Sequence, residues 1–130
     1  MAFFSVIVAA AAAYAFGAFW YMKWSSQWVA ATGISVDADG RPRNKSVVPY
    51  IIAGIAMLAV AGMMRHMFGM AGIDTLIKGL VSGFGLGTFV ALPWIVVNYA
   101  YADRPRQLIY IDGGYAVIGS TIIGAVLGLF

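Results

Sequence analysis

The chain of 130 residues has no cysteine, no glutamate and a single histidine, and only 10% of its residues are charged. Without cysteine it cannot be a disulfide scaffold, and one histidine alone does not make a metal site within one chain. A soluble domain carries about 25% charged residues, whereas this chain is 62% hydrophobic. Too little polar surface remains to cover a core in water, so the composition excludes a soluble monomer and indicates a membrane protein.

Four long apolar stretches are predicted to cross the bilayer as helices, because each approaches the roughly 20 residues that a spanning helix needs. They are rich in alanine, leucine and glycine and lack the alternating pattern of barrel strands. The expected fold is a single all-α domain over residues 1–130, with four transmembrane helices at residues 2–22, 48–64, 76–101 and 108–130.

The basic residues predict the orientation, because short loops rich in lysine and arginine stay in the cytoplasm. Arg65 and Lys78 lie on one side of the predicted bundle, and six basic residues lie on the other: Lys23, Arg41, Arg43, Lys45, Arg104 and Arg106. We therefore expect both basic loops in the cytoplasm and both termini outside it. Divided between two loops, these cations form no continuous surface for nucleic acid.

Three tryptophans, Trp20, Trp24 and Trp28, recur every four residues at the end of the first span. If the helix continues past Lys23, they form one stripe, and we interpret them as anchors at the membrane interface, where tryptophan is enriched. The alternative is a stripe that stacks on a ring-shaped ligand, such as a quinone or a pigment.

Two connecting segments carry polar residues. Residues 37–45 are predicted to form a surface turn, and Asp37 and Asp39 resemble the start of a calcium loop until Arg41 occupies the next ligand position. Residues 65–74 are expected to form an apolar loop in the interface. His66 in this loop is interpreted as an interfacial side chain, with ligation of a cofactor held by a partner chain as the alternative.

Small residues recur every four positions in the last two spans: Gly79, Gly83, Gly87 and Ala91 in one, and Ala116, Ser120, Gly124 and Gly128 in the other. Small residues let helix backbones approach closely, which matters in lipid because no hydrophobic force draws apolar helices together. Because the loop between the spans is short, they are expected to form a tight antiparallel hairpin. Its predicted register places Gly83 opposite Gly128, Gly87 opposite Gly124, and Ala91 opposite Ser120.

The same register places Asn98 and Asp112 at nearly equal depth, and Asp112 is the one acidic residue inside a predicted span. One interpretation is a hydrogen bond from the Asn98 amide to Asp112, with Arg104 or Arg106 nearby. The alternative is a proton or cation site, since an ionisable group in a membrane helix is a functional candidate. Pro93 is expected to kink the third helix, because it cannot donate a hydrogen bond to the Phe89 carbonyl.

Several short motifs are spread along the chain: Gly17-Ala18-Phe19-Trp20-Tyr21, Trp28, Gly33, Pro93, Asn98-Tyr99, Arg104-Pro105, Ile111-Asp112-Gly113-Gly114-Tyr115 and Gly124-Ala125-Val126-Leu127-Gly128. With these motifs the chain resembles the domain-of-unknown-function 1761 family of small bacterial membrane proteins. The resemblance implies a four-helix membrane protein and no established activity.

Three classes of function are weighed. An enzyme is disfavoured, because the chain offers neither a nucleophile paired with a base nor paired carboxylates, and we expect no catalytic residue, metal or cofactor beyond bound lipid. An oligomeric transporter or channel would use Asp112 and Asn98. We favour an accessory or structural subunit in a bacterial inner membrane, packed against other membrane chains in a homo-oligomer or in a larger complex, such as an energy-transducing one. A quinone or pigment contact is expected only through a partner.

Overall fold

The computed structural model describes residues 2–130, which form helices joined by short connections and one longer loop. The helices are α1 (Ala2–Lys23), α2 (Ser25–Thr32), α3 (Val48–Ala71), α4 (Leu76–Leu86), η1 (Gly87–Ala91), α5 (Leu92–Tyr101) and α6 (Arg106–Gly128). Since α4, η1 and α5 continue one another, they form one helix of 26 residues, the α4–α5 helix. Four helices are therefore long and apolar enough to cross a membrane, which confirms the predicted all-α fold.

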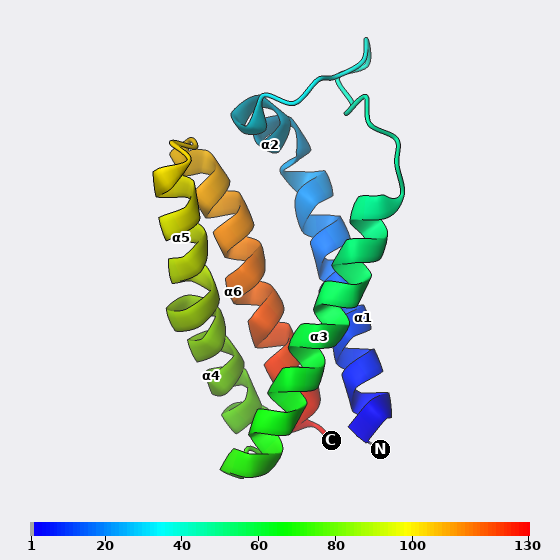
Figure 1. Ribbon diagram of the computed structural model, residues 1–130. Helices are drawn as coiled ribbons and strands as arrows, with labels where there is room; N and C mark the ends of the chain where they lie inside the picture. The colour runs from blue at the N-terminus through cyan, green and yellow to red at the C-terminus, as the bar shows by residue number, and fades with distance from the viewer. Residues whose placement is uncertain (1) are drawn as a thin grey trace.

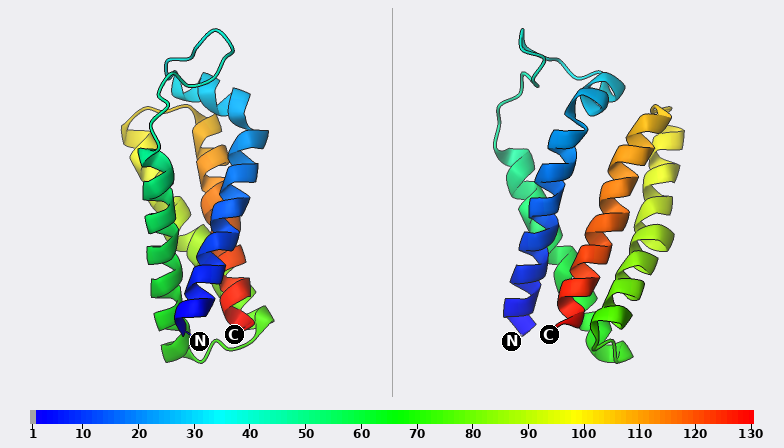
Figure 2. Two further views of the ribbon diagram at one scale, coloured as in Figure 1. Left: turned by 90° about the vertical axis from the view of Figure 1, so that its right-hand side faces the viewer. Right: turned by 180° about the vertical axis from the view of Figure 1, so that it is seen from behind.

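The four spans stand side by side, with both termini at one end of the bundle and α2 at the other (Figure 1). Helix α6 is the central element, because it packs against α1, α3 and the α4–α5 helix. Figure 2 shows α6 between α1 and the α4–α5 helix. We call the two ends of the bundle the terminal end and the α2 end.

The second span is longer than predicted, because α3 continues through the segment that was expected to be a loop. It ends only at Gly72, which has a φ of 70° and donates its N–H to the carbonyl of Phe68. That left-handed conformation suits glycine and stops the helix, whereas the charge of Arg65 does not stop it. Thr75 then caps the start of α4 by accepting the backbone N–H of Lys78 at 3.2 Å.

The first span does not continue as a straight helix past Lys23. Trp24 has φ −103° and ψ 19°, and α2 starts at the next residue. Two adjacent serines, Ser25 and Ser26, follow this bend, and serine pairs are a common cause of helix kinks. The bend brings α2 against α6 at the α2 end of the bundle.

The buried core lies between α1, α3 and α6, toward the terminal end. Small residues on α1 let both other helices approach, and larger side chains of α3 and α6 fill the remaining space. The members are Ala9, Ala10 and Ala13 of α1, Ala61, Met64 and Phe68 of α3, and Ile123 and Leu127 of α6.

The α4–α5 helix and α6 form the predicted tight, glycine-lined hairpin. A Cβ atom added at Gly79 would overlap the carbonyl of Gly124, and one added at Gly83 would overlap the carbonyl of Ser120. A Cβ atom on Gly128 would overlap the carbonyl of Thr75. Backbone therefore lies directly against backbone along this surface, which we call the glycine seam.

The predicted register of the hairpin is wrong. Gly83 faces Ser120 rather than Gly128, and Gly124 faces Gly79 rather than Gly87. The reason is the repeat itself, because small residues spaced by four match one another again after every shift of one helical turn. The π-helical turn η1, where the N–H of Leu92 donates to the carbonyl of Gly87, places an extra residue in the first helix of the hairpin.

Candidate functional site

The side chain of Asp112 is the centre of a polar cluster at the α2 end. It lies in the second turn of α6 and is half-buried. Its Oδ1 accepts hydrogen bonds from the Tyr21 hydroxyl at 2.6 Å and from the Trp28 indole N–H at 3.2 Å, and its Oδ2 accepts one from the Tyr99 hydroxyl. We call Asp112, Tyr21, Trp28 and Tyr99 the Asp112 cluster.

The cluster joins four helices through one carboxylate. Tyr21 belongs to α1, Trp28 to α2, Tyr99 to α5 and Asp112 to α6. All three donors are uncharged, and the ion pairs among residues 2–130 lie elsewhere, between Lys45 and Asp37 and between Lys78 and Asp74. Hydrogen bonds to a carboxylate are stronger than those between neutral groups, so three of them satisfy Asp112 without a cation.

Asn98, the predicted partner of Asp112, is not part of this cluster. Its side chain is exposed, and in the described part of the chain it forms no hydrogen bond with Asp112. Successive residues on a helix point about 100° apart, so the rotation of α5 that directs Tyr99 toward α6 directs Asn98 away from it. Arg104 does not pair with Asp112 either, and its guanidinium donates to the carbonyl of Thr32 at 3.0 Å.

The three tryptophans differ in their surroundings. The indole N–H of Trp20 donates to the carbonyl of Ile111 at 2.8 Å, and that of Trp28 donates to Asp112. The indole N–H of Trp24 is buried and has no hydrogen-bond partner among residues 2–130. Trp20 and Trp28 therefore bind α6 through their indole N–H groups, and their role as anchors at the membrane interface stays a prediction.

Aromatic rings pack beneath the cluster, and two glycines make room for them. The ring of Tyr115 stacks on Phe16 with centroids 6.2 Å apart and meets Tyr21 edge-on at 5.4 Å. A Cβ atom on Gly17 would lie 2.8 Å from the Tyr115 ring, and one on Gly114 would lie 2.8 Å from the Trp20 ring. These glycines allow α1 and α6 to enclose large rings.

The hairpin also contains an unpartnered hydroxyl. Thr88 lies in η1, and its Oγ1 is buried without a hydrogen-bond partner in the part of the chain that the structure describes. The following Pro93 lacks the N–H that would continue the helical pattern. The π-helical turn η1 directly precedes α5, in which Pro93 is the second residue.

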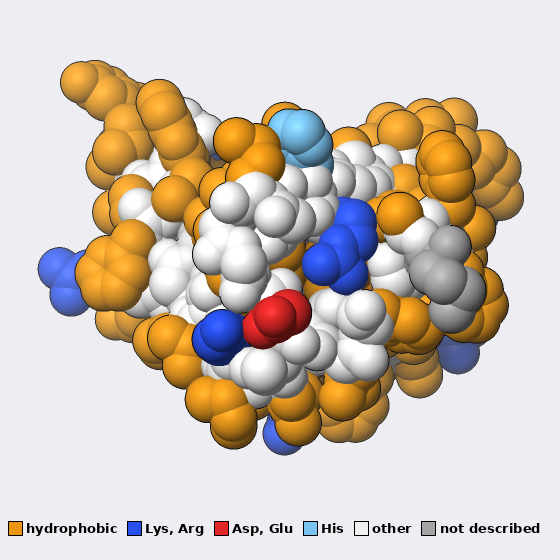
Figure 3. Space-filling model, turned by 90° about the horizontal axis from the view of Figure 1, so that it is seen from below, with side chains coloured by type: hydrophobic (Ala, Val, Ile, Leu, Met, Phe, Trp, Pro, Cys, Tyr) orange, Lys and Arg blue, Asp and Glu red, His pale blue; other side chains and the backbone are white. Residues whose placement is uncertain are grey.

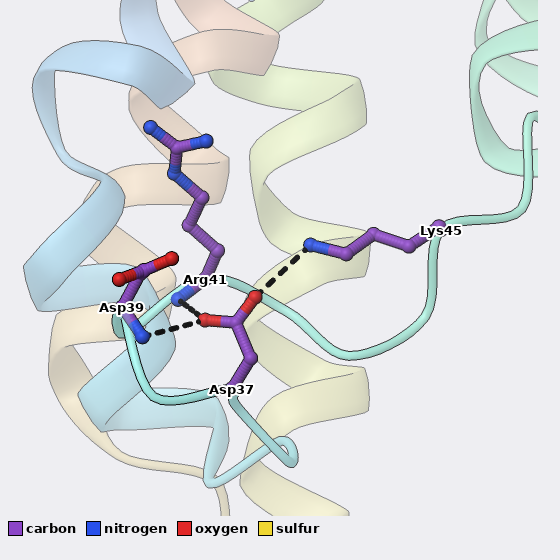
Figure 4. Close-up of polar contacts among 4 residues, drawn as sticks. All are labelled: Asp37, Asp39, Arg41 and Lys45. Atoms are coloured by element: carbon purple, nitrogen blue, oxygen red, sulfur yellow. Dashed lines mark hydrogen bonds and ion pairs between the residues drawn. The ribbon is translucent and has the colours of Figure 1, made fainter.

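The polar loop after α2 is held by its own side chains (Figure 4). The carboxylate of Asp37 accepts the backbone N–H of Arg41 at 3.0 Å and that of Asp39 at 2.9 Å, and it pairs with Lys45 at 3.2 Å. The hydrogen bond from Arg41 is the main cause that lowers the pKa of Asp37 below its ordinary value. The Asp37 carboxylate therefore holds the turn together by accepting hydrogen bonds from the loop itself, which is not the arrangement of a calcium ligand.

The residues that could hold a metal are dispersed. Among residues 2–130 the structure brings no three histidine, cysteine or acidic side chains together. His66 is exposed on α3 near the terminal end, far along the bundle from the Asp112 cluster at the α2 end.

Fold and site together define a multi-pass membrane protein whose spans are joined by a hydrogen-bonded carboxylate. The chain matches the model of the family described as protein of unknown function (DUF1761) over residues 4–128, and it belongs to this family. No curated protein and no solved structure matches the chain.

Several of the motifs that carry the family resemblance meet at the Asp112 cluster, whereas the motif at residues 124–128 lies in the glycine seam. All four members of the Asp112 cluster belong to these motifs, as do Trp20, Gly114 and Tyr115 around it. Tyr21 and Tyr99 were not predicted as partners of Asp112, although both lie within the motifs. Their occurrence in the same family motifs as Asp112 was the feature of the sequence that could have indicated them as its partners. A tyrosine hydroxyl is an ordinary donor to a carboxylate in a membrane helix.

Proposed function

We propose that the protein is a non-catalytic accessory or structural subunit of a larger assembly in a bacterial cytoplasmic membrane. Its partners are other membrane chains, and its basic loops face the cytoplasm with both termini outside. In this role the protein packs against other membrane chains. For that it needs rigid helices with exposed apolar faces, and it does not need reactive groups.

The observation that carries this proposal is the use made of Asp112. It is the one acidic side chain within the four spans, and three internal hydrogen bonds occupy it. Such a carboxylate holds α1, α2 and α5 against α6, which is a structural task. An ionisable group that served a path through the membrane would need contact with water or with an ion.

The outward faces of α3 and of the α4–α5 helix are the surfaces offered to partners. Large apolar side chains on them are strongly exposed, including Ile55 at 63% and Ile52 at 60% on one face and Phe89 at 77% and Trp94 at 68% on the other. Lipid covers such faces in an isolated subunit, and another helix replaces the lipid in an assembly.

Gentle extraction followed by native sizing and identification of the accompanying chains tests the proposal. We expect a defined companion, or further copies of this chain, in fixed proportion. Replacing both Phe89 and Trp94 by alanine should release the companion if the α4–α5 face binds it, and replacing Ile52 and Ile55 serves as the matched variant on α3. A monodisperse single chain after gentle extraction, unchanged by either pair, would contradict the proposal.

A second candidate function is transport of protons or cations by an oligomer. It is supported by the lack of a cation paired with Asp112 within residues 2–130 and by the unpartnered Thr88 hydroxyl in η1. Reconstitution of the purified chain in liposomes separates the two candidates. Conduction that disappears on Asp112→Asn would favour transport, and its absence in both forms would favour the structural role.

The proposed orientation can be measured directly, because the chain has no native cysteine. Ser35→Cys places a thiol in the loop after α2, and Asp74→Cys places one at the terminal end. With a membrane-impermeant thiol reagent on intact cells, we expect labelling at position 74 and none at position 35. The reverse pattern would overturn the orientation.

A further inference from the structure

A groove runs between α1 and α3 at the terminal end of the bundle. It has a volume of about 840 Å³ and is lined mostly by apolar side chains of the two helices. Its walls include Phe3 and Ile7 of α1 and Leu58 and Met70 of α3. Pockets for small molecules typically measure about 300–1,000 Å³, so the groove has room for an acyl chain.

Two glycines of α3 leave this groove open. Gly62 and Gly69 both line it, and a Cβ atom added to either would meet no atom within 4 Å. They differ from the glycines of the seam, where backbone fills the space in front of the missing side chain. Here the space in front of the glycines belongs to the groove.

Two nitrogen-bearing side chains lie in the groove lining, and no acidic residue accompanies them there. Arg65 is half-buried and donates one hydrogen bond, from Nη1 to the carbonyl of Leu127 at 3.1 Å. A guanidinium carries five N–H donors, so Arg65 has donors left for a ligand. His66 is its neighbour and is exposed. The acid at this end, Asp74, pairs instead with Lys78 at 3.3 Å.

The terminal end is viewed directly in Figure 3, where the chain's one histidine and basic side chains lie among hydrophobic ones. Helix α3 has 24 residues, about 36 Å at 1.5 Å per residue, against a hydrocarbon core of about 30 Å. Arg65 lies six residues before the end of α3, so its long side chain reaches the level of the lipid head groups.

From this combination we propose that the groove between α1 and α3 binds one anionic phospholipid. An acyl chain lies along Phe3, Ile7 and Leu58, and the phosphate accepts hydrogen bonds from Arg65 with His66 beside it. Arginine suits phosphate because its planar donors match the phosphate oxygens. The proposal goes beyond the proposed packing role and does not rest on it, since it concerns the lining of the groove and not the Asp112 cluster.

The test is native mass spectrometry of the purified chain with added phosphatidylglycerol or phosphatidylcholine. We expect one retained phosphatidylglycerol and about tenfold weaker retention of phosphatidylcholine, because both lipids carry the phosphate but the choline cation of phosphatidylcholine is repelled by the charge of Arg65. Gly62→Leu places a side chain in the groove at a position where an added Cβ atom meets nothing within 4 Å, and it should lower phosphatidylglycerol retention by about tenfold or more. Gly85→Leu is the matched control, because its added Cβ also meets open space but lies outside this groove.

Removal of charge gives the second arm. Arg65→Gln should abolish the preference for phosphatidylglycerol, whereas Lys78→Gln, which removes an exposed cation at the same end, should retain it. Thermal unfolding of each variant verifies that it folds. If Arg65→Gln does not fold, the lipid retention of Gly62→Leu compared with Gly85→Leu tests the proposal. Equal retention of the two lipids by the native chain, or equal loss in Gly62→Leu and Gly85→Leu, would overturn the proposal.

Discussion

Helix α6 is held in two different ways along its length. Toward the terminal end it lies against α4 through bare backbone, with Gly124 facing Gly79 and Ser120 facing Gly83. Toward the α2 end it is held by a carboxylate and by aromatic rings from α1, α2 and α5. Glycines occur in both regions, but in the first they admit another backbone and in the second they admit a ring.

The comparison predicts different sensitivities to substitution. A backbone cannot move aside to admit a new side chain, so the glycine seam tolerates no added atom without separation of the helices. The Asp112 cluster depends on several hydrogen bonds, each of modest net value, and it loses them one at a time. Steric changes in the seam should therefore have larger effects than polar changes in the cluster.

The largest effect is expected for Gly124→Leu, which places a side chain against the backbone of Gly79. We expect a loss of roughly 3 kcal/mol or more in the free energy of unfolding, from forced separation of α4 and α6. Protease resistance and thermal unfolding in detergent measure it. Gly85→Leu, on the same hairpin but facing open space, is the control and should unfold like the native chain. Equal stability of the two variants would show that the seam is not closely packed.

The next effect is expected for Asp112→Ala, which leaves the donors of Tyr21, Trp28 and Tyr99 without their acceptor. Loss of hydrogen bonds to a charged group should cost about 2–3 kcal/mol, and Asp112→Asn, which keeps one carbonyl oxygen, should cost less. Chemical unfolding in detergent ranks the two variants. Asn98→Ala is the control, because its side chain is exposed outside the cluster. An effect of Asn98→Ala equal to that of Asp112→Ala would contradict the geometry.

Two neighbouring tryptophans provide a smaller and sharper comparison. Trp20→Phe removes the hydrogen bond to the carbonyl of Ile111 and should cost about 1 kcal/mol. Trp24→Phe removes an N–H that has no partner among residues 2–130 and should cost little or stabilise the fold. Thermal unfolding of both variants under identical conditions gives the difference. A larger loss for Trp24→Phe would mean that its N–H binds a group outside the chain.

The smallest effect concerns the loop around Asp37 and is confined to it. The pKa of the Asp37 carboxyl is lowered in the folded loop. Its contribution to the stability of the loop is therefore fully present above its ordinary pKa of 3.8, and it is lost as the pH falls through the lower pKa of the folded loop. We expect the amide resonances of Asp39 and Arg41 to shift in that acidic window. Asp37→Asn should abolish the transition, and Asp39→Asn should leave it in place.

Much of the fold follows from local properties of the chain. The first, third and fourth spans start and end within about two residues of the predicted limits. The predicted second span is too short, because its end is placed before the charged Arg65, whereas a long side chain near a helix end can reach polar partners without ending the helix. The true end is the left-handed Gly72.

The site was predictable in its centre but not in its partners. Asp112 was singled out because it is the one acid in a span, and the structure places a polar cluster around it. Tyr99 rather than Asn98 reaches it, because the rotation of α5 about its own axis decides which of two neighbouring residues faces α6. Tyr21 reaches it from the end of α1, and Trp28 reaches it because the bend at Trp24 brings α2 against α6.

The sequence by itself determined that four helices cross a membrane and that two of them form a hairpin lined by glycine. Both properties reside in single segments, since insertion depends on the length and hydrophobicity of each helix and close approach depends on its small residues. Only the tertiary structure decided the register of the seam and the donors of Asp112. A repeat of four residues fits several registers equally well, so depth and rotation are settled where the side chains of different helices meet.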